Sequence, residues 1–417
     1  MAHLRPSPAQ LTWQKDGFGM FFHFGLNTFH GKEWSDGTLP ASSFNPTALD
    51  AEQWVQTALD AGAKYVVLTA KHHDGFCLWP TATTGYSVAS SPWRDGAGDV
   101  VAEVAAACRK LGMKLGLYLS PWDRNAACYP DQEAYDEFYL AQLRELCTNY
   151  GELCELWFDG AGSQGREYGW TRIAALIDEL QPGAMVFNMG APTIRWVGNE
   201  DGLAADPVTY VVDQTDFSNY TVHTAKLEQA LYLPPECDVS IRRSWFWHPD
   251  DAPKDLEHLL AIYYRSIGLG ANLLLNLPPD TRGLLPEEDV ARMREFAGEV
   301  RRRFQAPRTA TLRAAGPGRW VAGFAGEITL DHLVLAENLV DGQRVTSHRI
   351  STADGRVLVE AGTIGSQRIH VFSAATATEL VIELDGAEPM LDAVTGFHAG
   401  VESIPDINYL ATTEAPA

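Results

Sequence analysis

The chain has 417 residues, of which 46% are hydrophobic and 21% are charged, so it can bury a large core and build one large and one smaller domain. Its formal net charge of −22 argues against nucleic acid or an anionic membrane as a partner, because both would repel it. No apolar run is long enough to span a bilayer, and the first residues lack a secretory pattern. We therefore expect a cytoplasmic protein with a neutral or small polar ligand, although a chain trimmed of its leader would look the same.

Cysteine usage gives no sign of a zinc site or a disulfide framework. The cysteines are scattered along the chain and form no Cys-x-x-Cys pair. Paired spacing of that kind is typical of zinc sites and redox motifs. We expect buried free thiols at Cys77, Cys108, Cys128, Cys147, Cys154 and Cys237.

From the amino end, short apolar runs alternate with longer helix-like segments, which favours an α/β architecture with a parallel sheet. A closed (β/α)8-like barrel needs eight strands. Eight runs qualify, at residues 19–24, 65–70, 114–119, 154–158, 185–188, 210–213, 238–241 and 272–277. Residues 1–304 are therefore predicted to form a (β/α)8-like barrel.

Helix signals lie between these runs. The segment 50–62 begins with Asp50, a residue type that caps helix N-termini, and ends at Gly62, which suits the left-handed turn that ends a helix. Similar segments lie at residues 99–111, 132–150, 170–180, 256–268 and 286–304, with Gly112, Gly151 and Gly183 as stops. Residues 190–235 break the rhythm, and they are either an active-site insertion or a pair of irregular barrel units.

The composition changes after residue 304. Short alternating segments follow at residues 319–324, 327–336, 343–351, 368–373 and 379–383, with turn dipeptides such as Asp341-Gly342 between them. This pattern is typical of an antiparallel β-sandwich. We place the domain boundary at residues 305–308, so that residues 305–417 form a C-terminal β-sandwich domain. We expect this domain to pack on the flank of the barrel rather than to bind carbohydrate.

Polar and aromatic residues stand where the first four predicted strands end. The reactive groups of a (β/α)8 barrel come from the C-terminal ends of its strands. One such residue alone is more often a capping group, but four strands in succession favour a ligand site. Imidazole, carboxylate and indole suit a sugar, because hydroxyls need donors and acceptors while the C–H face of the ring packs on aromatic rings. The residues concerned are His23, His72, His73, Tyr118, Trp122, Trp157 and Asp159.

A metal-dependent barrel hydrolase is an alternative interpretation of the same histidines. Imidazoles from neighbouring strand ends are common metal ligands, so His23, His72 and His73 are candidates. Adjacent side chains on a strand point to opposite faces, however. His72 and His73 could therefore share a metal only where the strand has already become a loop, and we favour binding of hydroxyls.

Four motifs in this region resemble the α-L-fucosidases of glycoside hydrolase family 29. They are, in chain order, Met20-Phe-Phe-His-Phe-Gly-Leu-Asn-Thr-Phe29, Glu33-Trp34, Ala63-Lys-Tyr-Val-Val-Leu-Thr-Ala-Lys-His-His-Asp-Gly-Phe76 and Leu156-Trp-Phe-Asp-Gly160. The likeness runs from about residue 13 to residue 279, and the segment 333–345 resembles the C-terminal β-domain of that family. The resemblance implies hydrolysis of terminal α-L-fucose from oligosaccharides or glycoconjugates, with retention of configuration and without a metal or other cofactor.

The resemblance also implies roles for individual residues. Asp159 corresponds to the nucleophile of the family's Trp-x-Asp motif. The hydroxyls of fucose would be held by His23, Glu33, Trp34, His72 and His73. A catalytically silent fucose-binding protein that kept this pocket is a further alternative, and the presence of Asp159 together with a candidate glutamate argues against it.

The acid/base has two candidates, Glu200 and Glu236, since the family offers no single invariant motif here. The segments around both glutamates look like the subgroup that prefers α-1,3/4-linked fucose in branched oligosaccharides. We choose Glu200, because the 41 residues that separate it from Asp159 resemble the usual spacing in that subgroup. Glu236 stands beside the start of a predicted strand, and we interpret it as a structural carboxylate.

Overall fold

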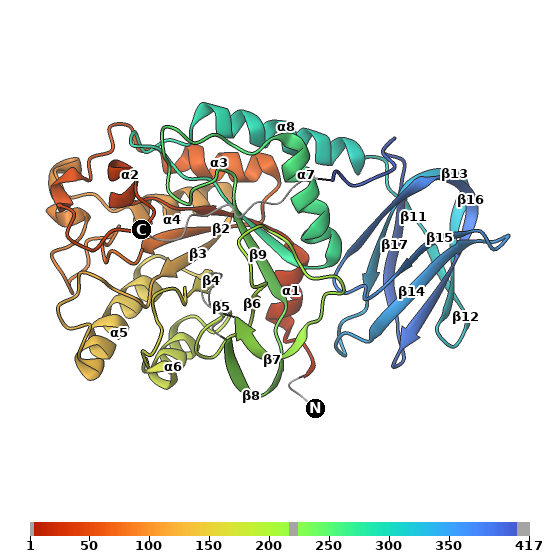
Figure 1. The fold of residues 1–417 in the computed structure, drawn as a ribbon, viewed down its shortest axis with the longest axis horizontal. Coiled ribbons are helices and arrows are strands. Elements are labelled where there is room, and N and C mark those ends of the chain that lie inside the picture. Colours follow the sequence, from red (N-terminus) through yellow and green to blue (C-terminus); the bar gives the residue numbers. More distant parts are fainter. Residues whose placement is uncertain (1–3, 217–223, 407–417) are drawn as a thin grey trace.

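The computed structural model describes residues 4–216 and 224–406, and its larger part is the predicted parallel barrel (Figure 1). The hydrogen-bonded order of the strands is β5-β4-β3-β2-β1-β10-β9-β6. An isolated parallel bridge between Phe187 and Ile194 links the two ends, so the barrel is nearly closed. The strands are β1 (Phe18–Phe22), β2 (Tyr65–Lys71), β3 (Lys114–Leu119), β4 (Leu153–Trp157), β5 (Met185–Phe187), β6 (Arg195–Trp196), β9 (Pro235–Ser240) and β10 (Asn272–Asn276).

The predicted helices are confirmed, and those at 50–62 and 99–111 end at the predicted glycines Gly62 and Gly112. The helix predicted at 170–180 ends at Leu180 with Gln181 as its cap, before the predicted stop at Gly183. The side chain of Asp50 accepts the backbone N–H of Gln53, and Gly62 ends the same helix in the left-handed conformation. The prediction for 256–268 was too long, because α7 stops at Arg265 and a 3-10 turn follows. The helices are α1 (Pro8–Asp16), α2 (Leu26–His30), α3 (Ala51–Ala61), α4 (Val100–Leu111), α5 (Gln132–Asn149), α6 (Trp170–Leu180), α7 (Leu256–Arg265) and α8 (Glu287–Arg303).

The strand predicted at residues 210–213 is not part of the barrel. It belongs to β7 (Val211–Asp216), which pairs antiparallel with β8 (Thr224–Tyr232) in a separate two-stranded sheet. Its place in the barrel is taken by β6, which is too short to show any periodicity in the sequence. The irregular stretch 190–235 therefore contains both a barrel strand and an insertion.

The C-terminal part is an antiparallel sheet of seven strands with its own apolar core. Two pairs of segments that were predicted as separate strands are continuous, in β13 (Arg319–Glu337) and β16 (Arg368–Gly386). Irregularities in their pairing, such as the shift between Gly323 and Ile328, interrupt the alternation and made each strand look like two. The other strands are β11 (Arg308–Thr309), β12 (Thr311–Gly316), β14 (Val345–Thr352), β15 (Val357–Ala361) and β17 (Leu391–Phe397).

This C-terminal sheet contacts the barrel through polar pairs, of which the first is buried and the second partly exposed. The hydroxyl of Tyr264 on α7 lies 2.7 Å from Nε2 of His332 on β13. Arg368 on β16 makes two hydrogen bonds, of 2.9 and 2.8 Å, to the carboxylate of Asp206 in the barrel insertion. Bidentate pairs of this kind set orientation as well as adding free energy. The sheet therefore packs at a defined position beside α7 and α8 (Figure 1).

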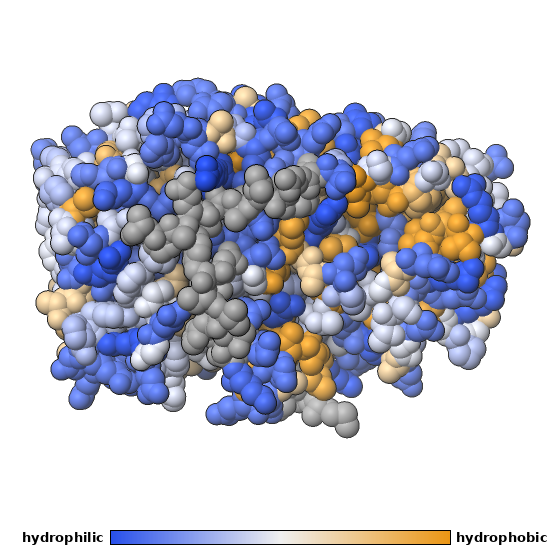
Figure 2. Space-filling model, in the orientation of Figure 1, coloured by the Kyte–Doolittle hydropathy of each residue, from blue (hydrophilic) through white to orange (hydrophobic). Residues whose placement is uncertain are grey.

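The surface over the barrel is polar. In Figure 2 the face over the barrel is mostly hydrophilic, and apolar areas gather over the C-terminal sheet. In the part of the chain that the structure describes, no helix combines the length and apolarity of a membrane span. The cysteines are free thiols as predicted, four of them buried and two partly exposed.

An aromatic cluster fills the interior of the barrel. Its members come from several strands and include Phe21, Tyr65, Tyr118, Trp157 and Phe187. The rings of Trp157 and Phe187 stack at 3.8 Å between centroids with an interplanar angle of 11°. Packed rings of this size leave no pore, so the barrel has a solid floor under its C-terminal end.

Candidate active site

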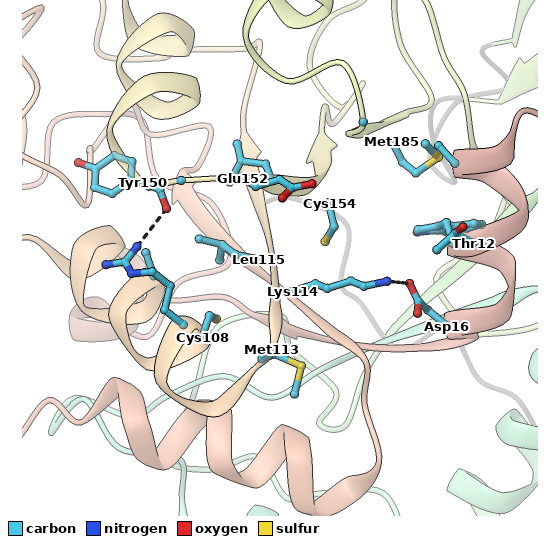
Figure 3. A pocket seen from close by; sticks show the side chains of 17 residues that line it. Thr12, Asp16, Cys108, Met113, Lys114, Leu115, Tyr150, Glu152, Cys154 and Met185 are labelled. Atoms are coloured by element: carbon cyan, nitrogen blue, oxygen red, sulfur yellow. Dashed lines mark hydrogen bonds and ion pairs between the residues drawn. The ribbon is translucent and has the colours of Figure 1, made fainter.

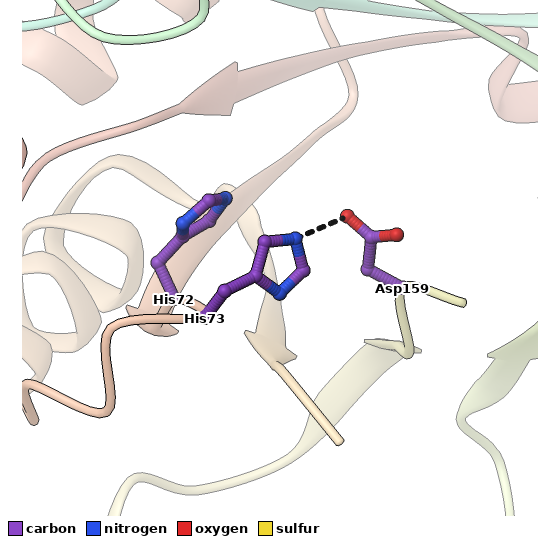
Figure 4. A group of neighbouring side chains, drawn as sticks. All are labelled: His72, His73 and Asp159. Carbon is purple, nitrogen blue, oxygen red and sulfur yellow. Dashed lines mark ion pairs between the residues drawn. The ribbon is translucent and has the colours of Figure 1, made fainter. Parts of the chain in front are cut away.

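Asp159 lies two residues beyond the end of β4, among groups that donate hydrogen bonds to it. Its Oδ2 accepts the hydroxyl of Tyr118 at 3.1 Å and lies 3.4 Å from Nε2 of His73 (Figure 4). Its Oδ1 accepts the backbone N–H of Ala161 at 2.8 Å. Burial alone would raise the pKa of Asp159, but His73, Ala161 and Tyr118 together outweigh it and hold the pKa below its usual value. Asp159 is therefore ionised at neutral pH.

His72 and His73 both face the site, contrary to the expectation for neighbours on a strand. Strand β2 ends at Lys71, so the two histidines belong to the following loop, and their ring centroids lie 4.2 Å apart. The ring of His72 stacks on Tyr118 at 5.6 Å. Burial, reinforced by the neighbouring histidines, lowers the pKa of His72 well below its usual value, so its imidazole is neutral.

His23, directly after β1, has its orientation and tautomer set by Asn276 at the end of β10. Oδ1 of Asn276 lies 2.9 Å from Nδ1 of His23 and also accepts the backbone N–H of His23 at 3.1 Å. An amide oxygen only accepts, so Nδ1 carries the proton and Nε2 is left as an acceptor. Burial lowers the pKa of His23 to about 3, which keeps the ring neutral. The ring can thus accept a hydrogen bond from a sugar hydroxyl.

Glu33 anchors the loop that carries Trp245 and Phe246. Its carboxylate accepts the backbone N–H of Trp245 at 2.8 Å and that of Phe246 at 3.3 Å. Both rings contact His23, with centroid distances of 5.0 and 5.5 Å. Burial raises the pKa of Glu33 to about 7, against the opposing effect of these two N–H groups. Glu33 therefore changes charge near neutral pH.

Two partly exposed indoles form a wall beside His73. The ring of Trp34 meets His73 edge-on at 5.2 Å and Trp122 at 5.4 Å. Trp122 also contacts His73 at 5.3 Å, and the guanidinium of Arg124 lies over its ring at 5.1 Å. Aromatic faces of this kind pack against the C–H groups of a sugar ring.

Trp157 and Glu236 lie below the site, inside the barrel. Nε1–H of Trp157 donates to Oε2 of Glu236 at 3.1 Å, and the hydroxyl of Tyr65 donates to Oε1 at 2.5 Å. Glu236 is completely buried, and burial raises its pKa. The pKa of the neighbouring Glu155 is also raised, by burial and by Glu236. Glu236 begins β9 rather than ending it, so its carboxyl lies in the floor of the barrel.

Glu200 lies in a rigid turn just after β6. Asn199 fixes this turn, since its side chain accepts the N–H of Leu203 at 3.3 Å and donates to the carbonyl of Leu203 at 2.8 Å. The charge of Glu200 contributes to raising the pKa of Glu33 and of Asp238. Glu200 is partly buried, and its charge acts on the pKa of Glu33.

Several residues of the site were not predicted from the sequence. Asn276, Trp245 and Phe246 all contact the predicted histidines or hold them in place. Asn276 stands at a strand end, so the rule that found His23 could have found it as well. No such signal exists for Trp245 and Phe246, because the loop they occupy has no regular pattern.

The structure brings together a different set of candidate metal ligands from the set predicted from the sequence. Within the described ranges, one group of three metal-ligating side chains comes together, and it is His72, His73 and Asp159, with ligand atoms within 4.8 Å of one another. His23 is not in this group. His73 and Asp159 already contact each other, whereas Nδ1 of His72 has no partner among the described residues.

A separate cavity of about 520 Å³ lies at the N-terminal ends of β3 and β4 (Figure 3). Its walls include Trp13, Leu115 and Cys154, and an ion pair of 2.6 Å between Lys114 and Asp16 crosses its edge. The opposite end of a (β/α) barrel carries the reactive groups. This cavity is therefore distinct from the site around Asp159.

An ionised carboxylate at the C-terminal end of a barrel strand, among imidazoles and indoles, is the arrangement of a barrel glycoside hydrolase. The sequence profile of the α-L-fucosidase family matches residues 2–300, and the chain belongs to that family. Alpha-L-fucosidase 1 of Arabidopsis thaliana is 48% identical over 300 residues, which cover 70% of this chain and 59% of the relative. The chain thus spans less than two thirds of the length of that plant protein.

Solved structures agree along nearly the whole chain. A glycoside hydrolase 29 family member from an unknown rumen bacterium has a TM-score of 0.86 and 34% identity, covering 98% of this chain and 79% of its own. A Ruminococcus gnavus GH29 fucosidase in complex with fucose has a TM-score of 0.82 and 28% identity, covering 95% of both chains. The similarity therefore includes the C-terminal sheet as well as the barrel.

Proposed function

We propose that the protein is a retaining exo-α-L-fucosidase that removes terminal α-1,3/4-linked fucose from branched oligosaccharides by double displacement. The observation that carries this proposal is Asp159, an ionised carboxylate held by Tyr118, His73 and Ala161 at the end of β4. Such a carboxylate is suited to attack an anomeric carbon. The fucose bound to the similar Ruminococcus gnavus enzyme supports the choice of sugar.

In the first step, an oxygen of Asp159 forms a bond to the anomeric carbon while the bond to the leaving oxygen breaks. Glu200 gives its proton to that oxygen, and the same glutamate later takes a proton from the water that releases fucose. The electrostatic coupling of Glu200 to Glu33 supports this role, because a negative charge on one disfavours a negative charge on the other. Glu236 is left in the floor of the barrel with Tyr65 and Trp157.

Sugar recognition follows from the neutral histidines and the indoles. Nε2 of His23 accepts from a hydroxyl, and His72 can donate or accept. Trp34 and Trp122 are partly exposed beside His73, where the leaving sugars of a branched oligosaccharide would pack. The sequence around Glu200 and Glu236 supports the α-1,3/4 preference through its likeness to that subgroup.

Product analysis on a panel of fucosides tests the proposal. We expect cleavage of Lewis trisaccharides to exceed cleavage of an aryl α-L-fucoside and of 2′-fucosyllactose, with NMR showing that the first product is α-L-fucose. Release of β-L-fucose would overturn the retaining mechanism. Equal cleavage of all three substrates would overturn the linkage preference, and binding of fucose without turnover of any of them would point to a silent binding protein.

A further inference from the structure

We propose that Ser120 is a positioning residue that keeps both ring nitrogens of His73 protonated, so that Asp159 is paired with an imidazolium. This inference rests on the proposed role of Asp159 as the nucleophile. The hydroxyl of Ser120, just after β3, contacts Nδ1 of His73, whereas Nε2 of the same ring faces Asp159. Ser120 is completely buried, so the hydroxyl cannot exchange its partners for bulk water.

The direction of two hydrogen bonds determines where the proton on Nδ1 lies. The hydroxyl of Ser120 donates to the backbone carbonyl of Trp122 at 2.6 Å, and Oγ lies 2.7 Å from Nδ1 of His73. A carbonyl oxygen only accepts, and a serine hydroxyl has a single proton to give. When that proton goes to Trp122, Oγ must accept from the ring, and Nδ1 of His73 therefore carries a hydrogen.

The other ring nitrogen of His73 faces a carboxylate. Nε2 lies 3.4 Å from Oδ2 of Asp159, and this pair is drawn in Figure 4. An ionised carboxylate also only accepts, so Nε2 must carry a hydrogen to make the contact attractive. With acceptors at both nitrogens, the ring is held as an imidazolium. The backbone of His73 is fixed as well, because its carbonyl accepts the N–H of Arg124 at 2.9 Å.

In this proposal, His73 is the cationic member of the group formed by His23, His72 and His73. Burial keeps His23 and His72 neutral. Asp159 and Tyr118 face the ring across the site, and the rings of Trp34 and Trp122 flank it. The flanking segments carry four more charged or titratable groups. Lys71 and Asp123 pair at 2.9 Å, and the guanidinium of Arg124 lies over the ring of Trp122. The fourth is Asp74, and burial raises its pKa to about 7.

The imidazolium stabilises the carboxylate in the free enzyme and again as the second displacement regenerates it. When the glycosyl ester forms, Asp159 loses its charge while His73 keeps both protons. Departure of fucose restores the charge opposite that cation. The arrangement therefore favours breakdown of the ester, and it does so without any proton transfer by His73 itself.

Direct observation of the ring nitrogens tests the inference without substrate. In uniformly 15N-histidine-labelled enzyme at pH 7, assigned through His73→Gln, we expect both nitrogens of His73 to show protonated shifts. The same spectrum of Ser120→Ala should show one protonated nitrogen, and Ser120→Thr, which keeps a hydroxyl, should restore two. A neutral His73 ring in the unmodified enzyme at pH 5 to 7 would overturn the inference, whether or not the variants fold.

The pH profile gives an independent readout. Loss of the hydroxyl should move the basic limb of kcat/KM for Ser120→Ala to lower pH by about one to two units, because a hydrogen bond to the charged ring is gone. Ser120→Thr should return the limb to its original position. A uniform loss of rate with an unchanged basic limb in Ser120→Ala would overturn the inference. Failure of the proposed function would appear instead as full activity of Asp159→Ala.

Discussion

Nε1–H of Trp157 donates to Oε2 of Glu236 at 3.1 Å. This bond distinguishes Glu236 from Glu200, the other candidate for the acid/base. It commits the carboxyl of Glu236 to the interior of the barrel, together with the hydroxyl of Tyr65. The same bond directs the indole N–H of Trp157 into the barrel interior, whereas the sequence analysis predicted that Trp157 contacts substrate. Trp157 acts on the site through its ring, which stacks on Tyr118 at 5.5 Å.

Replacing the nucleophile should remove turnover. We expect Asp159→Ala to lower kcat on an aryl α-L-fucoside by at least about a thousandfold, because no other carboxylate replaces it in the attack. Added azide should restore part of the rate and give β-L-fucosyl azide, which NMR identifies. The matched control is Asp178→Ala, an exposed aspartate on α6, which should leave kcat unchanged. Full activity of Asp159→Ala would contradict the assignment.

The two glutamates should differ in their dependence on the leaving group. Glu200→Ala should retain much of its rate on fucosides with very acidic leaving groups and lose at least about a hundredfold on unactivated oligosaccharides, which need a proton. Glu236→Gln keeps the shape of the side chain and should show no such split. Kinetics on aryl fucosides of graded leaving-group pKa provide the measurement. The reverse pattern would transfer the role to Glu236.

Glu33 should make stability depend on pH. Its pKa is raised to about 7 by burial, while in the unfolded chain it is near the ordinary value of 4.5. Between these values the folded state keeps a proton that the unfolded state has lost. The contribution of Glu33 to stability is therefore full below pH 4.5 and falls as the pH rises through 7.

Urea unfolding of the unmodified protein and of Glu33→Gln checks this sign. Relative to Glu33→Gln, the free energy of unfolding of the unmodified protein should fall by about 1 to 3 kcal/mol between pH 5 and pH 8. The comparison cancels the other buried carboxyls, which are present in both proteins. A constant difference across this range would show that Glu33 titrates at the same pH in both states.

Arg242 should be needed for the loop that carries Trp245 and Phe246. It is almost completely buried and binds Asp289 on α8 at 2.8 Å. Arg242→Met should lower the free energy of unfolding by about 3 to 5 kcal/mol, because it leaves the carboxylate of Asp289 buried without a partner. The double variant Arg242→Met/Asp289→Leu should recover part of that loss. Additive losses in the double-mutant cycle would contradict this explanation.

Chelation should leave the rate unchanged. Nε2 of His73 and Oδ2 of Asp159 already contact each other at 3.4 Å, and the proposed chemistry needs no Lewis acid. Activity is measured after dialysis against a chelator and again after adding back Zn²⁺ or Mn²⁺. Loss of activity that the metal restores would favour the alternative of a metal-dependent hydrolase built on His72, His73 and Asp159.

The elements best predicted from the sequence are those whose signals are local. Helix α3 carries its own N-cap at Asp50 and its own stop at Gly62, so a short window contains all the information. Strand β6 has only Arg195 and Trp196, and it exists because β9 offers a partner from far along the chain. Long-range pairing of this kind leaves no periodic pattern, which is why β7 was mistaken for the barrel strand.

The same distinction applies to the site. His23, His72, His73 and Asp159 follow strand ends, so the barrel geometry brings them together. The direction of a side chain depends on its partners, and those lie far away in the sequence. Trp157 faces Glu236, 79 residues further along, and His23 faces Asn276, 253 residues away.

The weak closure of the barrel at β6 has a consequence for how such an enzyme can change its substrates. The proposed nucleophile Asp159 follows β4, which is paired on both sides, whereas Glu200 follows a two-residue strand that is hydrogen-bonded mainly to β9. If the proposed roles hold, the carboxylate that attacks fucose and the glutamate that protonates the leaving group are supported by different strands of the barrel. Mutation can then reshape the segment that carries Glu200 while Asp159 stays in place.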